Sequence, residues 1–295
     1  MQRITNETNT LCTVTTSFLV VLDSVNASFK NNGDWNSDVT FNFESPIEKP
    51  INSFLMSMAV QQFNCPNSLY NINETNNLLH IREALPTTPV TYGDYNISIP
   101  YGNYNVNTFN TQLLTLLSTA TGSNRFSLQF NKLNNKFTLV NSTNEFTIKS
   151  DSTINNVMGL KKATDQSSVL KILACPYNCN FNGIESISIS LNNIQTPNID
   201  SYHKSNAHIV QTIPVDSTLS SISYDKSNDY SFKLTDHTFE NLQVQITTGE
   251  NNLVNLNNQD WNMTLVFSIM YDVNRFDHQN TFHNVLQYGY YGYNV

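Results

Sequence analysis

The sequence predicts a mainly β protein, an antiparallel sandwich or jelly roll that carries a small inserted α+β subdomain. Three observations lead to this fold class. Apolar and polar residues alternate along many short segments, each ending in Asn, Gly, Asp or Pro, as is typical of half-buried strands joined by turns. One segment only has the apolar stripe of a long helix. Hydrophobic residues make up 39% of the chain, including 17 Phe and 14 Tyr, which argues against disorder.

The first predicted strands follow a polar segment, residues 1–12, which we expect to form an N-terminal arm. In one of these strands Val39, Phe41 and Phe43 occupy alternate positions, directly after a run of Asn, Gly and Asp. We assign residues 13–85 to the first part of a jelly-roll domain.

Residues 86–169 have a different pattern and are predicted to form the inserted α+β subdomain. An amphipathic helix is expected here, with Asn105 or Asn107 as its N-cap and Gly122 beyond its end. Its apolar stripe consists of Phe109, Leu113, Leu116 and Leu117. Short strands are expected around residues 95–99, 126–130, 137–139 and 146–148, and a helical turn before Gly159.

The second part of the jelly-roll domain is predicted within residues 170–272. Ile187, Ile189 and Leu191 alternate with serines, which indicates a strand with one buried face. The run 261–271 alternates without a break, and its length favours a central strand because each residue advances the chain by about 3.3 Å. Neither flank of the insert alone has enough strands for two sheets, so we place both flanks in one discontinuous domain.

Charged residues are scarce and mostly acidic. They make up 13% of the chain, against a usual value of about 25%, and the formal net charge is -8. No direct binding of nucleic acid is expected, because such binding needs clustered Lys and Arg. The polar start of the sequence and the short apolar run 18–22 predict neither a secretory signal nor a membrane span.

No motif names a catalytic, cofactor or metal site, so we predict that the protein is not an enzyme. None of the six His residues stands in an HExxH, HxH or Cys-adjacent arrangement, and no nucleophile elbow, P-loop or dinucleotide fingerprint is present. The four cysteines are not arranged as zinc-binding pairs, and we expect buried free thiols. These cysteines are Cys12, Cys65, Cys175 and Cys179.

Two acidic pairs are the remaining candidates for chemistry. Asp225 with Asp229, and Asp236 with Glu240, lie in turn-like sequence, where Asp usually makes local backbone hydrogen bonds. A glycosidase dyad needs only that two carboxylates meet in space, so the sequence leaves that alternative open.

The C-terminal segment, residues 273–295, is predicted to be a Tyr-rich tail. Its candidate interface residues are Tyr288, Tyr290, Tyr291 and Tyr293. Tyr offers a large contact area at a small entropic cost and is favoured at interfaces. Two interpretations stay open, a disordered terminus and a segment that docks onto a neighbouring subunit.

Two parts of the sequence resemble a known family. Residues 239–246 and 260–267 are similar to the last strands of penton proteins from virophages and related polinton-like viruses. Residues 99–104, the Leu-rich helix, Phe137 and Met158-Gly159-Leu160 resemble the small inserted module of vertex and minor capsid proteins of double-stranded DNA viruses. The Asn-rich composition is most similar to the mavirus type within this family.

The resemblance implies a structural capsid protein. Its copies would form homopentamers, or pentons, at the vertices of an icosahedral virion, beside the major and minor capsid proteins. The virion would be assembled inside the host cell, in a cytoplasmic viral factory, and the resemblance carries over no catalytic residue. A receptor- or carbohydrate-binding module on the virion surface is the alternative, because fold alone does not separate these functions.

Overall fold

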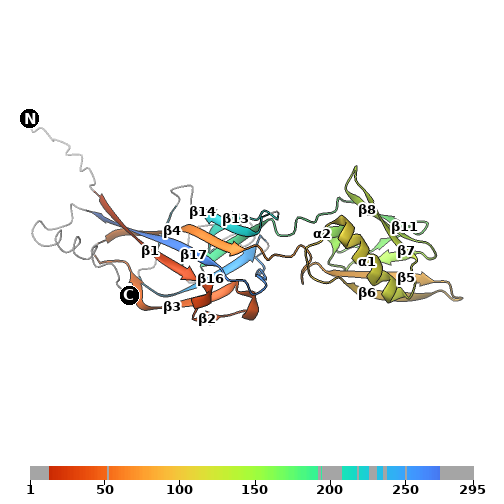
Figure 1. Cartoon of the computed structure of the whole chain (residues 1–295), viewed down its shortest axis with the longest axis horizontal. Helices are drawn as coiled ribbons and strands as arrows, with labels where there is room; N and C mark the ends of the chain where they lie inside the picture. The colour runs from red at the N-terminus through yellow and green to blue at the C-terminus, as the bar shows by residue number, and fades with distance from the viewer. Residues whose placement is uncertain are drawn as a thin grey trace, which may run out of the picture. The chain divides into compact units, whose positions relative to one another are not determined.

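The computed structural model describes residues 13–51, 53–191, 194, 208–217, 219–225, 231–234, 238–249 and 251–272. It divides the chain into two compact units (Figure 1). The sandwich unit lies within residues 1–67 and 186–295, and the inserted unit comprises residues 68–185. The predicted arm, residues 1–12, and the predicted tail, residues 273–295, lie outside the described residues.

The sandwich unit consists of two antiparallel sheets. One has the strand order β1-β17-β4-β14, with β15 also pairing with β4, and the other has the order β13-β12-β16-β3-β2. Short 3-10 turns at Ser24–Asn26 and Gly33–Trp35 follow β1 and β2. The strands are β1 (Thr13–Asp23), β2 (Phe29–Lys30), β3 (Asp38–Glu48), β4 (Ser53–Pro66), β12 (Ser186–Leu191), β13 (Ile209–Pro214), β14 (Ser221–Asp225), β15 (Phe232–Lys233), β16 (Thr238–Thr248) and β17 (Asn262–Asp272).

The strand pairing is that of one long hairpin rolled up on itself. In chain order the eight main strands are β1, β3, β4, β12, β13, β14, β16 and β17, and the outermost two, β1 and β17, pair with each other. The next pairs inward are β3 with β16, β4 with β14, and β12 with β13. Rolling the hairpin adds the pairs β17–β4 and β12–β16. This is the jelly-roll order, so the predicted fold class is confirmed.

Aromatic side chains join the two sheets in the core. Trp261, directly before β17, is buried, and its ring lies 6.1 Å from that of Phe41 on β3 and 5.9 Å from that of Phe63 on β4. Phe239 on β16 and Phe267 on β17 lie 6.5 Å apart between ring centroids. Both sheets therefore contribute to one core.

The predicted long central strand is confirmed as β17, which lies between β1 and β4 in its sheet. Its alternate residues Met263, Leu265, Phe267 and Ile269 are buried, while the residues between them are half-buried. The alternation read from the sequence therefore also gives the correct inward face.

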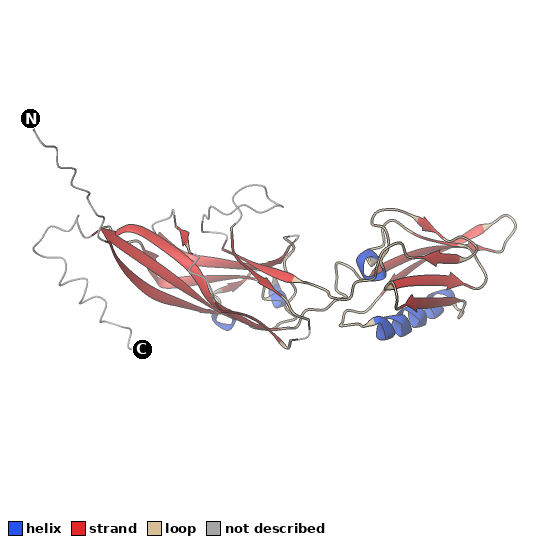
Figure 2. Cartoon of the chain, turned by 90° about the horizontal axis from the view of Figure 1, so that it is seen from above, coloured by secondary structure: helices blue, strands red, loops and turns tan. Residues whose placement is uncertain are grey.

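The inserted unit combines two small sheets with a helix along one side (Figure 2). The sheet orders are β10-β9-β5-β6 and β11-β8-β7, and α1 packs against β6 and β7. The elements are β5 (Leu78–Leu85), β6 (Thr91–Ser98), α1 (Val106–Thr121), β7 (Phe126–Asn131), β8 (Lys136–Asn141), β9 (Phe146–Ile148), α2 (Asn155–Met158), β10 (Gln166–Ser167) and β11 (Ile172–Ala174).

The predicted helix is confirmed as α1, together with its ends. The Asn105 side chain accepts hydrogen bonds from the backbone N–H groups of Asn107 and Thr108, at 2.9 and 3.1 Å. The Thr108 hydroxyl accepts one in return from the Asn105 backbone, which completes a capping box. Gly122 follows the helix with a left-handed φ of 64°, and Gly159 ends the predicted turn, α2, in the same way with φ 76°.

The predicted domain boundaries at residues 85/86 and 169/170 were wrong. β5, which was expected in the jelly roll, pairs with β6 and β9 of the inserted unit. Likewise β11 pairs with β8. The inserted unit therefore starts at Ser68 and ends at Glu185. Period-two alternation shows that a segment is a strand, but it does not show which sheet the strand joins.

Candidate contact surfaces

The residues predicted to form an interface lie outside the described part of the chain. This applies to Tyr288, Tyr290, Tyr291 and Tyr293, so their role stays a prediction. It applies also to Cys12 and to one member of each acidic pair, Asp229 and Asp236. The described residues offer three other candidates, which are a polar network, a turn region of the inserted unit and the edges of the sandwich sheets.

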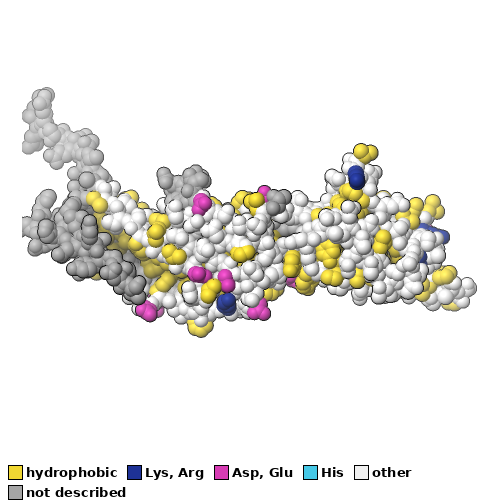
Figure 3. Space-filling view, viewed as in Figure 1, with side chains coloured by type: hydrophobic (Ala, Val, Ile, Leu, Met, Phe, Trp, Pro, Cys, Tyr) yellow, Lys and Arg dark blue, Asp and Glu magenta, His cyan; other side chains and the backbone are white. Residues whose placement is uncertain are grey.

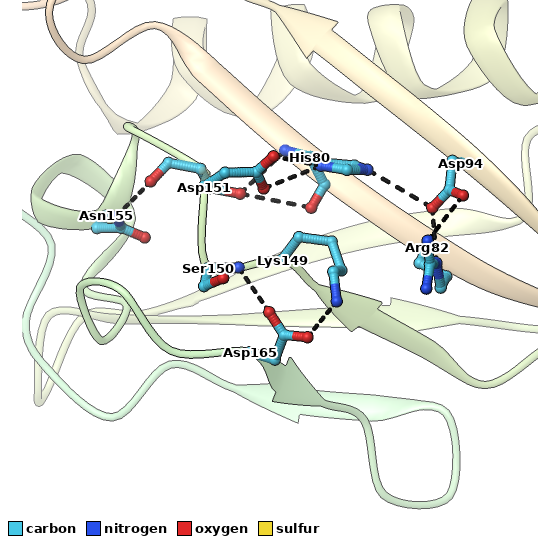
Figure 4. Close-up of polar contacts among 9 residues, drawn as sticks. His80, Arg82, Asp94, Lys149, Ser150, Asp151, Asn155 and Asp165 are labelled. Carbon is cyan, nitrogen blue, oxygen red and sulfur yellow. Dashed lines mark hydrogen bonds and ion pairs between the residues drawn. The ribbon is translucent and has the colours of Figure 1, made fainter.

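The polar network lies beside β5 in the inserted unit (Figure 4). Nδ1 of His80 is 2.9 Å from both carboxylate oxygens of Asp151, and its Nε2 is 3.5 Å from Asp94. Arg82 donates two hydrogen bonds to Asp94, at 2.8 and 3.0 Å. A histidine between two carboxylates is an arrangement that catalytic sites also use, so its electrostatics decide its interpretation.

The carboxyl groups of this network are held in their ionised form. Hydrogen bonds from Arg82 lower the pKa of Asp94, and the hydrogen bond from His80 lowers the pKa of Asp151. Nearby, the hydrogen bond from Lys149 lowers the pKa of Asp165 as well. A general acid needs a raised pKa, so these shifts run in the opposite direction. The network links β5 to β6 and to the turn after β9.

The described cysteines are also unsuited to nucleophilic chemistry. Burial raises the pKa of Cys65 to about 12, and the charge of Asp260 adds to this shift. Burial raises the pKa of Cys175 to about 12 as well, with Cys179 adding to it, and a thiolate is therefore disfavoured. The prediction of buried free thiols is confirmed for Cys65 and Cys175, while Cys179 is half-buried. Among the described residues no group of His, Cys, Asp or Glu is arranged to hold a metal ion.

A buried ion pair in the inserted unit was missed by the sequence analysis. Glu83 is fully buried and accepts hydrogen bonds from Arg125 at 2.7 and 2.6 Å. Asn141 and Asn144 donate to the same carboxylate, at 2.6 and 2.9 Å. The sequence does contain a sign of this site, because Glu83 lies on the same face of the strand as the buried Leu79 and Ile81, two residues further along. An acid at an inward position implies a buried partner.

Turns from three parts of the chain meet at one end of the sheet β10-β9-β5-β6. This end contains the connection from β5 to β6, the connection from β10 to β11 and the start of β9. The connections of the unit to the rest of the chain are at the other end, where the side-chain amide of Asn71 donates to the carbonyls of Tyr104 and Phe181. We call the first end the turn tip. Its exposed apolar residues are Val90, Tyr92, Val169, Leu170 and Ile172, which are between 47% and 82% exposed.

One turn of the turn tip is held in an unusual conformation. Leu170 and Lys171 both have positive φ angles, 53° and 68°, in a region where residues other than Gly are disfavoured. Glu145 stabilises this turn, because its carboxylate accepts hydrogen bonds from the Ser168 hydroxyl at 2.6 Å and the Lys171 N–H at 3.0 Å. Strained backbone that the surroundings hold in place is often found at binding sites.

The visible surface is only weakly charged. In Figure 3 the side chains of Lys, Arg, Asp and Glu are scattered, with uncharged residues covering most of the face drawn. This agrees with the 13% of charged residues in the sequence. In the part of the chain that the structure describes, no helix is long and apolar enough to cross a membrane.

Comparisons with known proteins found similarity among solved structures alone. No protein-family model matches the sequence, and no curated protein matches it either. Among solved structures, the chain is similar to the crystal structure of SeMet-labelled mavirus penton protein, with 13% sequence identity and a TM-score of 0.44. The match covers 88% of this chain and 100% of that chain. The jelly-roll assignment depends on the strand order alone.

Proposed function

We propose that this chain is a structural capsid protein, five copies of which form a penton at each vertex of an icosahedral virion. Its partners are further copies of itself and the major and minor capsid proteins. It acts in the virion, after assembly in a cytoplasmic viral factory, and it is not an enzyme.

The observation that carries the proposal is the complete jelly-roll strand order of the sandwich unit. Jelly rolls occur in viral capsid proteins, lectins and cupins, so the fold alone leaves several functions open. The similarity of residues 239–246 and 260–267 to the last strands of penton proteins favours the capsid function.

The mass of the purified full-length protein in solution tests this proposal. Light scattering after size-exclusion chromatography, together with native mass spectrometry, should give five times the mass of one chain. Added salt should favour this form, because it screens repulsion between copies that each carry a net charge of -8. A protein that stays monomeric at high concentration and high salt would contradict the penton assignment.

The tail has a separate role in this proposal, which is to attach the ring to the rest of the shell. Removal of Tyr288 to Val295 should weaken incorporation into capsids and leave the fold unchanged, since β17 ends at Asp272. Co-expression with the capsid partners and analysis of the assembled shells measures this. Shells that incorporate the shortened chain as efficiently as the full chain would exclude this role of the tail.

A receptor contact at the virion surface is a second candidate function. The turn tip favours it, because the exposed apolar side chains of Val169, Leu170 and Ile172 flank a turn that hydrogen bonds hold in place. Screening of the full-length protein on glycan arrays and on host-cell membranes tests this function. Binding that is lost in Leu170→Ser, but kept in a matched variant at the exposed hairpin residue Leu133, would support it.

A further inference from the structure

One edge of the sandwich unit differs from the others. β1 is the edge strand of its sheet, and within the described part of the chain it pairs with β17 alone. Its eleven residues keep one register with β17 from Thr13 to Asp23, without a bulge. A regular edge of this length presents a row of free backbone donors and acceptors to another strand.

The side chains of β1 add an apolar surface to this backbone edge. Leu19 and Val21 are 61% and 69% exposed, and they point away from the core. Phe18 stacks on Phe267 with ring centroids 5.4 Å apart, so Phe18 lies on the core side of the sheet, as does Val14. Phe18 and Val14 are nevertheless about 40% exposed. Figure 3 shows apolar side chains along the course that β1 takes in Figure 1. In the part of the chain that the structure describes, both faces of the edge therefore carry exposed apolar side chains.

The other edges of the same two sheets are protected in the usual ways. β2 has only two residues and ends in Lys30. β13 ends in Pro214, and β14 has five residues and ends in Asp225. Short strands, charges and prolines of this kind prevent pairing between sheet edges. β1 differs from them because it has eleven residues and contains no proline, glycine or charged residue before its last residue, Asp23.

We propose that β1 is the edge through which one copy of this chain docks onto a second copy. This inference deepens the proposed function, on which it rests, by naming a surface for contacts between copies. An extended segment of the neighbouring copy, other than its β1 because a closed ring joins different patches, would extend the sheet β1-β17-β4-β14 and cover these apolar side chains.

Charge favours a second copy as the occupant. Each copy carries a net charge of -8, so most contacts between copies bring negative charges together. Residues 13–22 carry no charge, so contact at this edge adds no close pair of like charges to that repulsion. Backbone hydrogen bonds and apolar burial suffice to hold such a contact.

The test compares a double variant with a matched control. Leu19→Lys together with Val21→Lys places two charges on the outer face of the edge. The control, Val90→Lys, changes a residue of similar exposure, 57%, in the inserted unit. We expect association between copies to weaken roughly tenfold or more in the double variant and to stay unchanged in the control. Tryptophan fluorescence checks that the sandwich unit is folded, since Trp35 and Trp261 both belong to it.

Hydrogen exchange of the unmodified protein gives a measurement that needs no variant. Those β1 amides that do not bond to β17 should gain protection when the protein is concentrated enough to associate. If the double variant forms the same oligomers as the wild type equally well, the edge proposal is overturned and the penton proposal stands. If the wild type forms dimers and the double variant does not, the edge proposal is supported and the penton proposal is contradicted. A monomer with protected β1 amides would show that the chain covers its own edge, which overturns both.

Discussion

Glu83 shows what a single buried charge contributes to the inserted unit. Its carboxylate has four hydrogen bonds, two from Arg125 and one each from Asn141 and Asn144. Removing one partner of a buried ion pair leaves an uncompensated charge, which costs about 3–5 kcal/mol. We expect Arg125→Met to reduce the unfolding free energy of the inserted unit by that amount. Urea unfolding followed by far-UV circular dichroism measures it, and the tryptophan signal of the sandwich unit should stay unchanged.

The same carboxylate should make the stability of the inserted unit depend on pH. Burial by itself raises the pKa of Glu83, but hydrogen bonds from Arg125, Asn144 and Asn141 outweigh burial, and the pKa is lowered overall. Its contribution is therefore present above the unfolded pKa of about 4.3 and is lost as the pH falls through the folded pKa. Unfolding at a series of pH values should show that acidification lowers the unfolding free energy less in Glu83→Gln than in the wild type. Equal losses in both proteins would contradict this assignment.

Phe267 and Thr264 test which face of β17 is buried. Phe267 is fully buried between Phe18 and Phe239, whereas Thr264 is half-buried and lies on the other face. We expect Phe267→Ala to cost about 3–5 kcal/mol of unfolding free energy and Thr264→Ala less than about 1 kcal/mol. Denaturant titration followed by tryptophan fluorescence measures both. The reverse order would mean that the strand register is shifted by one residue.

At the scale of elements, the sequence identified most strands and the helix but not how distant strands pair. Alternation gave the inward face of β17, and Asn105 and Gly122 gave the ends of α1. β5 was placed in the wrong unit because its partners, β6 and β9, are fixed by three-dimensional packing and not by local pattern. The exposed edge of β1 was missed for the same reason, since an edge is defined by the absence of a neighbouring strand.

The corrected boundaries lead to a prediction about deletion of the inserted unit. Its apolar core, from Ile72 to Cys175, is made within residues 68–185. Replacing Ser68–Glu185 with a short Gly/Ser bridge should therefore leave a soluble β protein with native tryptophan fluorescence and a cooperative unfolding transition. A collapsed product with molten spectra would contradict the division into two units.

A second deletion provides the control. Removing only residues 86–169, as the sequence alone suggested, leaves β5 and β11 without β6, β8 and β9. The buried faces of Leu79 and Ile81 would then be exposed to water. We expect this variant to aggregate, whereas the deletion of residues 68–185 stays soluble.

At the scale of the whole molecule, association must overcome repulsion between acidic copies. Only 13% of the residues are charged, yet the net charge is -8 per copy, and the proposed ring of five would bring these charges together. Closed rings use contacts in which one patch meets a different patch on the next copy. Neutral hydrogen bonds, ordered water and apolar edges can make such contacts without ion pairs.

Association between copies should therefore strengthen as salt is added. The screening length falls from about 10 Å at 0.1 M salt to about 3 Å at 1 M, so repulsion between copies decreases while neutral contacts remain. Sedimentation velocity over a series of sodium chloride concentrations should show a rising fraction of the ring. Sucrose at matched osmolality serves as a control, because it favours surface burial without screening charge. A ring that dissociates as sodium chloride is added would mean that attractive ion pairs between copies hold it together, which contradicts an assembly through neutral contacts.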